Sequence, residues 1–267
     1  MKRNVFLLVA WLTSFVVQAQ DNDCYAFRAQ LDGCISVEIY YEVESERNVA
    51  GYIYYPKAKH PAPILLVGYW NDNSSDDEDN YIHLYMTEYQ PDGTVSGEIY
   101  LLATNVEGDV NIVEGEWTNP NTHKKMKLSN FVYLGDYPDW FTESPFQPAD
   151  PQMLGQEYSY SIWSDKYGDM MGGSVELRGA GRGRVHFHVC NTLPNIAEGA
   201  SNTGRPAILD VDDRGLYFIY GPLSDCDYTF MARFYKQFVI LSTVSRPEDN
   251  CFGWNASFDG VYIKTKQ

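Results

Sequence analysis

Hydrophobic and polar residues alternate along many short segments of the chain, which is the pattern of β-strands with one buried face. In residues 81–86, for example, Ile82, Leu84 and Met86 share one face of the predicted strand. Glycine, proline, asparagine and aspartate cluster between such segments, as they do in turns. Outside the first nineteen residues, no window of comparable length has the spacing of an amphipathic helix. The pattern therefore predicts an all-β protein.

The predicted strands fall into two groups. The first group spans residues 35–44, 48–56, 63–70, 81–89, 94–104, 110–117 and 125–134, and the second spans 158–164, 172–177, 184–190, 206–211, 215–220, 226–235, 237–245 and 256–264. Four prolines, which cannot donate to a strand ladder, separate the groups. We predict an N-terminal β domain at 20–134, a Pro-rich linker at 135–157 that packs on the surface through its aromatics, and a C-terminal β domain at 158–267.

Glycine recurs just before or within predicted strands that carry an aromatic residue, at Gly51, Gly97, Gly115 and Gly260. Glycine at such points marks a bulge, a bend or a close approach of backbones in a strongly curved sheet. Short sequential strands with such kinks fit meandering antiparallel barrels, because closing a sheet removes its exposed edges. We expect two tandem antiparallel barrel-like (meander) domains.

The first nineteen residues predict a secretory signal peptide. Lys2 and Arg3 precede an apolar run that ends at Val17, and Val17 and Ala19 are small residues at the positions that determine cleavage. The run is shorter than the roughly 20 apolar residues that a membrane-spanning helix needs. We expect a periplasmic or extracellular protein with no membrane insertion once the leader is removed.

The net charge is −16, from 36 acidic and 20 basic residues. Nucleic acid is therefore a poor partner, because affinity for phosphate backbones comes from clustered lysine and arginine. The scarcity of basic residues also disfavours binding to anionic lipid surfaces. Acidity on this scale favours solubility first and cation binding second.

Candidate chemistry is sparse. His186 and His188 would face the same side of one strand, but no third metal ligand lies nearby in the sequence. Acidic residues crowd the segment 72–79 without the glycine and terminal glutamate of a calcium loop. Glu114 and Glu116 share a strand face, as a glycosidase pair could, although an acidic chain contains such pairs by chance. The sequence predicts no metal site, no cofactor and no assignable catalytic residue.

The five cysteines suggest disulfides, because an exported chain meets oxidising conditions. Cys226 opens one predicted strand and Cys251 lies just before the last, so a bridge between them would staple the C-terminal hairpin. Cys24 and Cys34 flank a predicted turn and form a second candidate pair, although their positions across that turn are not symmetric. Cys190 is then left over, as a buried small hydrophobe or a free thiol.

The C-terminal part contains a cysteine strand from Cys226 to Phe230, a Cys-Phe-Gly-Trp turn at 251–254 and a closing Asp-Gly-Val-Tyr strand at 259–262. This ending resembles that of secreted β-rich proteins of gut-type Bacteroidetes. The segments 51–55, 86–89 and 115–120 look like the small β-barrel domains of the same kind of protein. These proteins are largely uncharacterised, so the resemblance implies the fold and export and carries over no catalytic residue.

The chain is rich in aromatics, with 21 tyrosines and 6 tryptophans, which could build a sugar-stacking or protein-binding surface. Trp140 in the linker and Trp163 at a strand end are the candidates for binding residues. We expect an exported, non-catalytic binding or inhibitory module that recognises a glycan, a peptide or a secreted protein. An extracellular carbohydrate-active hydrolase is the alternative, and a structural subunit of a surface assembly is a further one.

Overall fold

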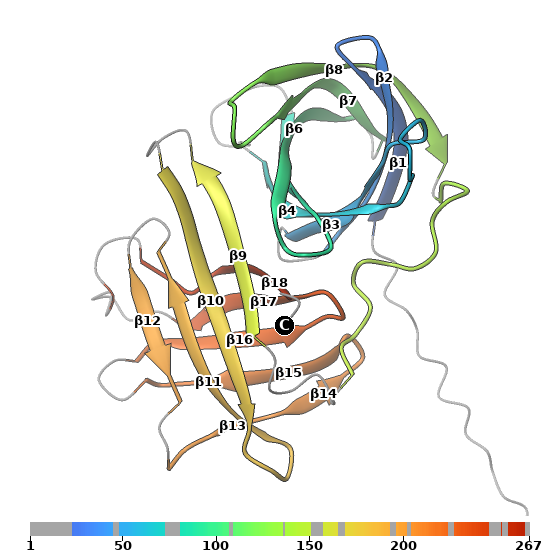
Figure 1. Ribbon diagram of the computed structural model, residues 1–267. Helices are drawn as coiled ribbons and strands as arrows, with labels where there is room; N and C mark the ends of the chain where they lie inside the picture. The colour runs from blue at the N-terminus through green and yellow to red at the C-terminus, as the bar shows by residue number, and fades with distance from the viewer. Residues whose placement is uncertain are drawn as a thin grey trace, which may run out of the picture.

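The computed structural model describes residues 23–44, 48–72, 81–106, 109–135, 137–150, 157–164, 169–192, 196–201, 204–223, 227–245, 252 and 256–264. Its regular elements are β-strands, which confirms the predicted all-β class (Figure 1). The predicted leader, Cys226 and Cys251 lie outside the described residues.

The first eight strands form a closed antiparallel barrel in sequence order, which Figure 1 shows from one end. Its strands are β1 (Asp23–Leu31), β2 (Ile35–Val43), β3 (Asn48–Tyr54), β4 (Ile64–Asp72), β5 (Tyr81–Tyr89), β6 (Val95–Val106), β7 (Asp109–Thr118) and β8 (Lys125–Gly135). β1 closes the ring by pairing with β8. The sequence pattern did not predict β1. Because every strand has two neighbours, the barrel has no free edge.

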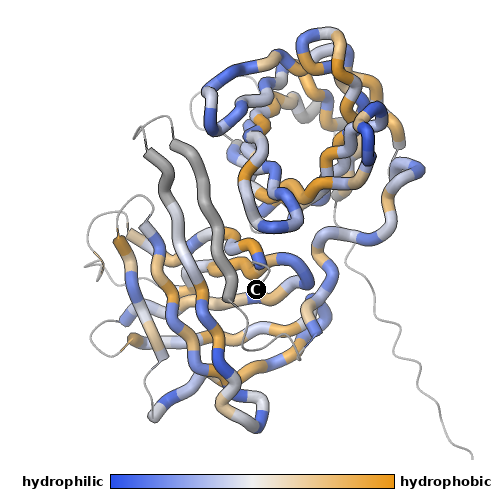
Figure 2. The backbone as a smooth tube through the Cα atoms, viewed as in Figure 1, coloured by the Kyte–Doolittle hydropathy of each residue, from blue (hydrophilic) through white to orange (hydrophobic). Residues whose placement is uncertain are grey.

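The barrel interior is built by the two-residue period of its strands. Leu84 and Met86 of β5 are buried inside and Ile82 packs against them, as the alternation predicts. On β2 the inward residues are apolar, among them Val37 and Ile39. Figure 2 shows the same alternation of hydrophobic and hydrophilic positions around the ring. The apolar face of each strand thus turns inward, and closure hides these faces from water.

The remaining strands form one antiparallel sheet with the order β12-β11-β10-β9-β18-β17-β16-β15-β14, and β13 also pairs with β11. They are β9 (Glu157–Ser164), β10 (Asp169–Gly179), β11 (Arg184–Asn191), β12 (Ala197–Ala200), β13 (Ala207–Ile208), β14 (Asp210–Asp212), β15 (Gly215–Tyr220), β16 (Thr229–Phe234), β17 (Phe238–Ser245) and β18 (Gly260–Lys264). The sheet folds over so that β9–β12 cross β14–β18 (Figure 1). This sheet is not closed. The prediction of two antiparallel barrel-like domains is therefore confirmed as a barrel for the first half, whereas the second half is an open antiparallel sheet.

β17 is apolar on both faces because it borders two cores. Val239 and Leu241 point into the core of the second sheet. Phe238 and Ile240 belong to a different cluster, which they share with Tyr40 on the outer face of the barrel. The second sheet therefore packs against the barrel through an apolar interface.

Residues 137–150 cross that interface and pack on the barrel through aromatic rings. The ring centroids of Phe141 and Tyr40 are 4.3 Å apart, and Trp140 stacks on Tyr54 with ring centroids 5.2 Å apart. Three outward carboxylates, those of Glu38 and Glu42 on β2 and of Glu44 just after it, accept hydrogen bonds from the residues that cover them. The donors are Trp140 Nε1 for Glu38, Ser144 Oγ for Glu42 and the Tyr235 hydroxyl for Glu44. These buried carboxylates are stable because each has a donor.

The candidate disulfide between Cys24 and Cys34 is not formed. Cys24 lies near the start of β1, opposite Glu42, whereas Cys34 lies in the turn at the other end of the β1–β2 hairpin. The strand register therefore separates the two residues by most of the length of the hairpin, beyond the reach of a disulfide. The Cys34 thiol instead donates to the Leu31 carbonyl. Cys190 forms no disulfide in the described part of the chain.

Candidate functional site

A row of three tyrosines crosses the outer face of the barrel. Tyr69 on β4 lies directly opposite Tyr85 on β5, which lies opposite Tyr100 on β6. The ring centroids are 5.1 Å apart in the first pair, with nearly parallel planes, and 5.3 Å apart in the second. Tyr69 is 54% exposed and Tyr85 39% exposed. We call these three residues the tyrosine row.

The surroundings raise the pKa of two hydroxyl groups of the tyrosine row, those of Tyr69 and Tyr100. Partial burial, with a contribution from neighbouring Tyr85, raises the pKa of Tyr69. Burial, Tyr85 and the carboxylate of Glu114 raise the pKa of Tyr100. A hydrogen bond of 3.0 Å joins the Tyr100 hydroxyl to Nδ1 of His83. Tyr69 and Tyr100 therefore present neutral hydroxyl groups, which can both donate and accept.

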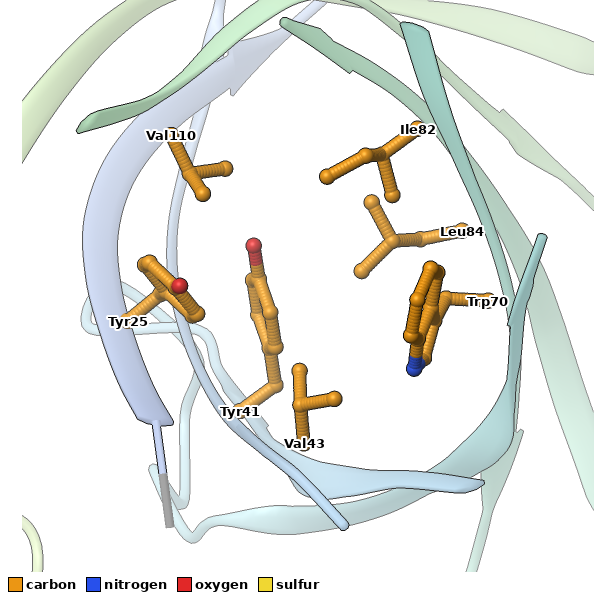
Figure 3. Close-up of a pocket in the computed structure, with 7 residues that line it drawn as sticks. All are labelled: Tyr25, Tyr41, Val43, Trp70, Ile82, Leu84 and Val110. Atoms are coloured by element: carbon orange, nitrogen blue, oxygen red, sulfur yellow. The ribbon is translucent and has the colours of Figure 1, made fainter. Parts of the chain in front are cut away.

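A second candidate site is a cavity of about 130 Å³ inside one end of the barrel. This is the end at which β1 begins and β2 ends, and we call it the open end. Figure 3 shows the walls of the cavity. The seven lining residues are uncharged and mostly apolar: Tyr25, Tyr41, Val43, Trp70, Ile82, Leu84 and Val110. Tyr25 and Tyr41 are stacked, with ring centroids 5.1 Å apart.

The opposite end of the interior, which we call the plugged end, is filled by a polar contact. Glu88 is only 2% exposed, and its Oε2 accepts hydrogen bonds from Trp117 Nε1 at 3.0 Å and from the Tyr55 hydroxyl at 3.2 Å. A Cβ at position 97 would lie 2.2 Å from the Trp117 nitrogen, so any residue other than glycine would clash with the indole ring. The glycine expected at a close approach is thus required here by a side chain rather than by a neighbouring backbone.

The two tryptophans singled out in the sequence are placed differently. Trp140 is half-buried between Tyr54 and Glu38, so its ring and nitrogen are already occupied within the chain. Trp163 lies on β9 and its backbone pairs with Met170 of β10. The structure does not bring the two together with the tyrosine row.

The other titratable candidates lie apart from both sites. On β11, His186 bonds to Ser201 and His188 to Glu198. Glu116 forms an ion pair with Lys125 at 3.0 Å on the outer face of the barrel. Within the described ranges no group of three or more histidine, cysteine, aspartate or glutamate side chains could hold a metal ion. Of the predicted acidic loop, residues 73–80 lie outside those ranges.

Sequence reasoning did not name the tyrosine row or the cavity. One signal for the row was present, because the alternation that points Leu84 and Met86 inward also points His83 and Tyr85 outward. The alignment of Tyr69, Tyr85 and Tyr100 across three strands depends on register, which single segments do not reveal.

No family model, curated protein or solved structure matches the chain. Among the described residues there is also no helix with the length and hydropathy needed to span a membrane.

Proposed function

We propose that this protein is an exported, non-catalytic binding module and that the tyrosine row binds a neutral glycan. The observation that carries the proposal is the alignment of Tyr69, Tyr85 and Tyr100 on an exposed sheet face. A tyrosine offers a rigid ring and a hydroxyl group at low entropic cost, so a row of them provides contact area and hydrogen bonds together. A sugar presents C–H surfaces and hydroxyl groups of matching character.

Charge and topology favour a neutral glycan over the other candidate ligands. The net charge of −16 disfavours acidic saccharides. The closed barrel has no edge to which a peptide could add as a strand. A protein partner would need roughly 800 Å² of surface on this side alone, far more than three tyrosine side chains supply.

Binding of the protein without its predicted leader to an array of neutral and acidic glycans tests the proposal. We expect neutral glycans to be retained and Tyr85→Ala, which removes the middle of the row, to weaken binding by roughly tenfold or more. Tyr85→Phe keeps the ring and removes the hydroxyl, so it separates stacking from hydrogen bonding. Tyr133→Ala is the matched control, because Tyr133 is a 63% exposed barrel tyrosine outside the row.

Three outcomes would contradict the proposal. Folded wild-type protein that binds no neutral glycan would remove it, and so would equal losses in Tyr85→Ala and Tyr133→Ala. Release of new reducing ends from a bound glycan would replace the binding module with a carbohydrate-active hydrolase.

A further inference from the structure

The open end of the barrel carries a second inference, which is independent of the tyrosine row. We propose that the cavity at the open end binds a small, neutral, monocyclic aromatic molecule that accepts one hydrogen bond from the Tyr41 hydroxyl.

The lining selects for an apolar ligand. Val43, Ile82, Leu84 and Val110 contribute only hydrocarbon surface. Such a lining favours an apolar guest, because the guest removes hydrocarbon surface from water. Tyr25 and Trp70 add aromatic walls on opposite sides of the space (Figure 3). Aromatic rings favour another ring in an offset or edge-to-face arrangement.

Tyr41 provides the polar feature that orients the guest. The residue is 1% exposed, and Figure 3 shows its hydroxyl directed into the space that the other lining residues enclose. Within the described part of the chain this hydroxyl has no hydrogen-bond partner, since its ring contacts are with Tyr25 and Phe27. Burial raises the pKa of Tyr41, so the group is a neutral donor.

Other buried tyrosines of this protein have satisfied hydroxyl groups, which makes Tyr41 distinct. Their partners are side chains or backbone carbonyls: Glu42 for Tyr40, Thr243 for Tyr228, Glu44 for Tyr235 and the Phe258 carbonyl for Tyr262. A hydroxyl that faces an apolar cavity gains a hydrogen bond when a guest brings an acceptor atom. The cavity therefore favours a guest with one acceptor over an equally large hydrocarbon.

Volume and charge narrow the class of guest further. An engineered apolar cavity of about 150 Å³ binds benzene, so about 130 Å³ limits the guest to a single ring. None of the seven lining side chains is charged, and the chain is strongly acidic. A carboxylate guest would have to lose its hydration without a compensating cation, which excludes anions. A neutral aromatic ether, ketone or aldehyde fits these limits.

Anisole and ethylbenzene form a matched pair of probes, because each is one ring with a two-atom substituent and only anisole carries an acceptor oxygen. We expect titration calorimetry on the protein without its predicted leader to give anisole a dissociation constant roughly 3- to 10-fold lower than that of ethylbenzene. Benzoate, an anion of similar size, should show no binding.

Two kinds of variant locate the site. In Tyr41→Phe the dissociation constants of anisole and ethylbenzene should become about equal, and that of ethylbenzene should change by no more than about twofold. Val110→Phe and Val43→Phe each fill the cavity from its wall and should abolish binding of both probes. Having two filling variants keeps the test valid if one of them does not fold. Tyr133→Ala should leave anisole binding unchanged, because Tyr133 is 63% exposed and does not line the cavity.

The inference is overturned if folded wild-type protein binds neither probe, or if it binds anisole and ethylbenzene equally. It is also overturned if folded filling variants still bind them, or if benzoate binds most tightly. None of these results depends on whether the tyrosine row binds a glycan.

Discussion

The two ends of the barrel interior are formed by the same eight strands, yet a tyrosine hydroxyl has a hydrogen-bond partner at one end and faces a cavity at the other. At the plugged end the Tyr55 hydroxyl and the Trp117 nitrogen share the buried carboxylate of Glu88. At the open end Tyr41 is only 1% exposed and its hydroxyl faces a cavity of about 130 Å³. A small eight-stranded barrel can either fill its interior with side chains or hold one small ligand. In this barrel, side chains fill the plugged end, and the open end leaves room for a small ligand.

Breaking the plugged end should have the largest effect on stability. Glu88→Ala removes the acceptor shared by Trp117 and Tyr55 in a buried space, so we expect the free energy of unfolding to fall by about 3 kcal/mol. Urea denaturation at neutral pH measures this loss. The control is Glu114→Ala on the exposed outer face, which should change stability by no more than about 0.5 kcal/mol. A Glu88→Ala protein as stable as the wild type would show that the polar plug is not stabilising.

Alkaline pH should reveal the buried hydroxyl at the open end. Burial raises the pKa of Tyr41 in the folded protein, whereas in the unfolded chain a tyrosine ionises near about pH 10. Its contribution to stability is therefore complete below about pH 10 and is lost as the pH rises further. We expect Tyr41→Phe to reduce the slope of unfolding free energy against pH above that point by about 1.4 kcal/mol per pH unit.

Urea denaturation at a series of alkaline pH values provides this slope. Val43→Ala is the control, because it changes the same cavity and keeps Tyr41, so the wild-type slope should persist. Identical slopes in Tyr41→Phe and the wild type would mean that Tyr41 already ionises in the folded protein.

At neutral pH the same substitution should have opposite effects at the two ends, and this is the smallest expected difference. Tyr55→Phe removes a hydrogen bond to Glu88 and should lower the free energy of unfolding by about 1 kcal/mol. Tyr41→Phe removes a hydroxyl without an acceptor and should leave stability unchanged or raise it by up to about 1 kcal/mol. Thermal and urea unfolding of both variants test the contrast, which equal losses in the two proteins would refute.

Local sequence patterns predicted most of the strands because inward and outward residues alternate cleanly where one face meets water. β1 was missed because the interface covers part of its outer face, where Ala26 is fully buried and gives no polar signal. The predicted strand at 206–211 is divided in the structure, since β13 pairs with β11 while β14 pairs with β15. Partners distant in the sequence decide that division, and no local pattern encodes it.

The candidate sites were harder to predict than the strands for the same reason. Trp140 was a candidate binding residue because it lies in the linker; its ring stacks on Tyr54 and its nitrogen donates to Glu38. Tyr25 lies opposite Tyr41 through the β1–β2 pairing. Trp70 of β4 and Val110 of β7 line the same cavity because β1 and β8 close the ring. The residues of both sites were visible in the sequence, whereas their convergence is a property of register and closure.

The interface at β17 has a consequence for how this protein can be divided into fragments. Phe238, Ile240 and Ile263 are buried against the barrel, whose own outer residues Tyr40 and Val67 are buried by them and by residues 137–150. A cut within residues 137–150 would expose an apolar surface to water on each half. Recombinant halves should consequently be prone to self-association, and solvent exclusion rather than the peptide connection keeps the halves of the intact molecule together.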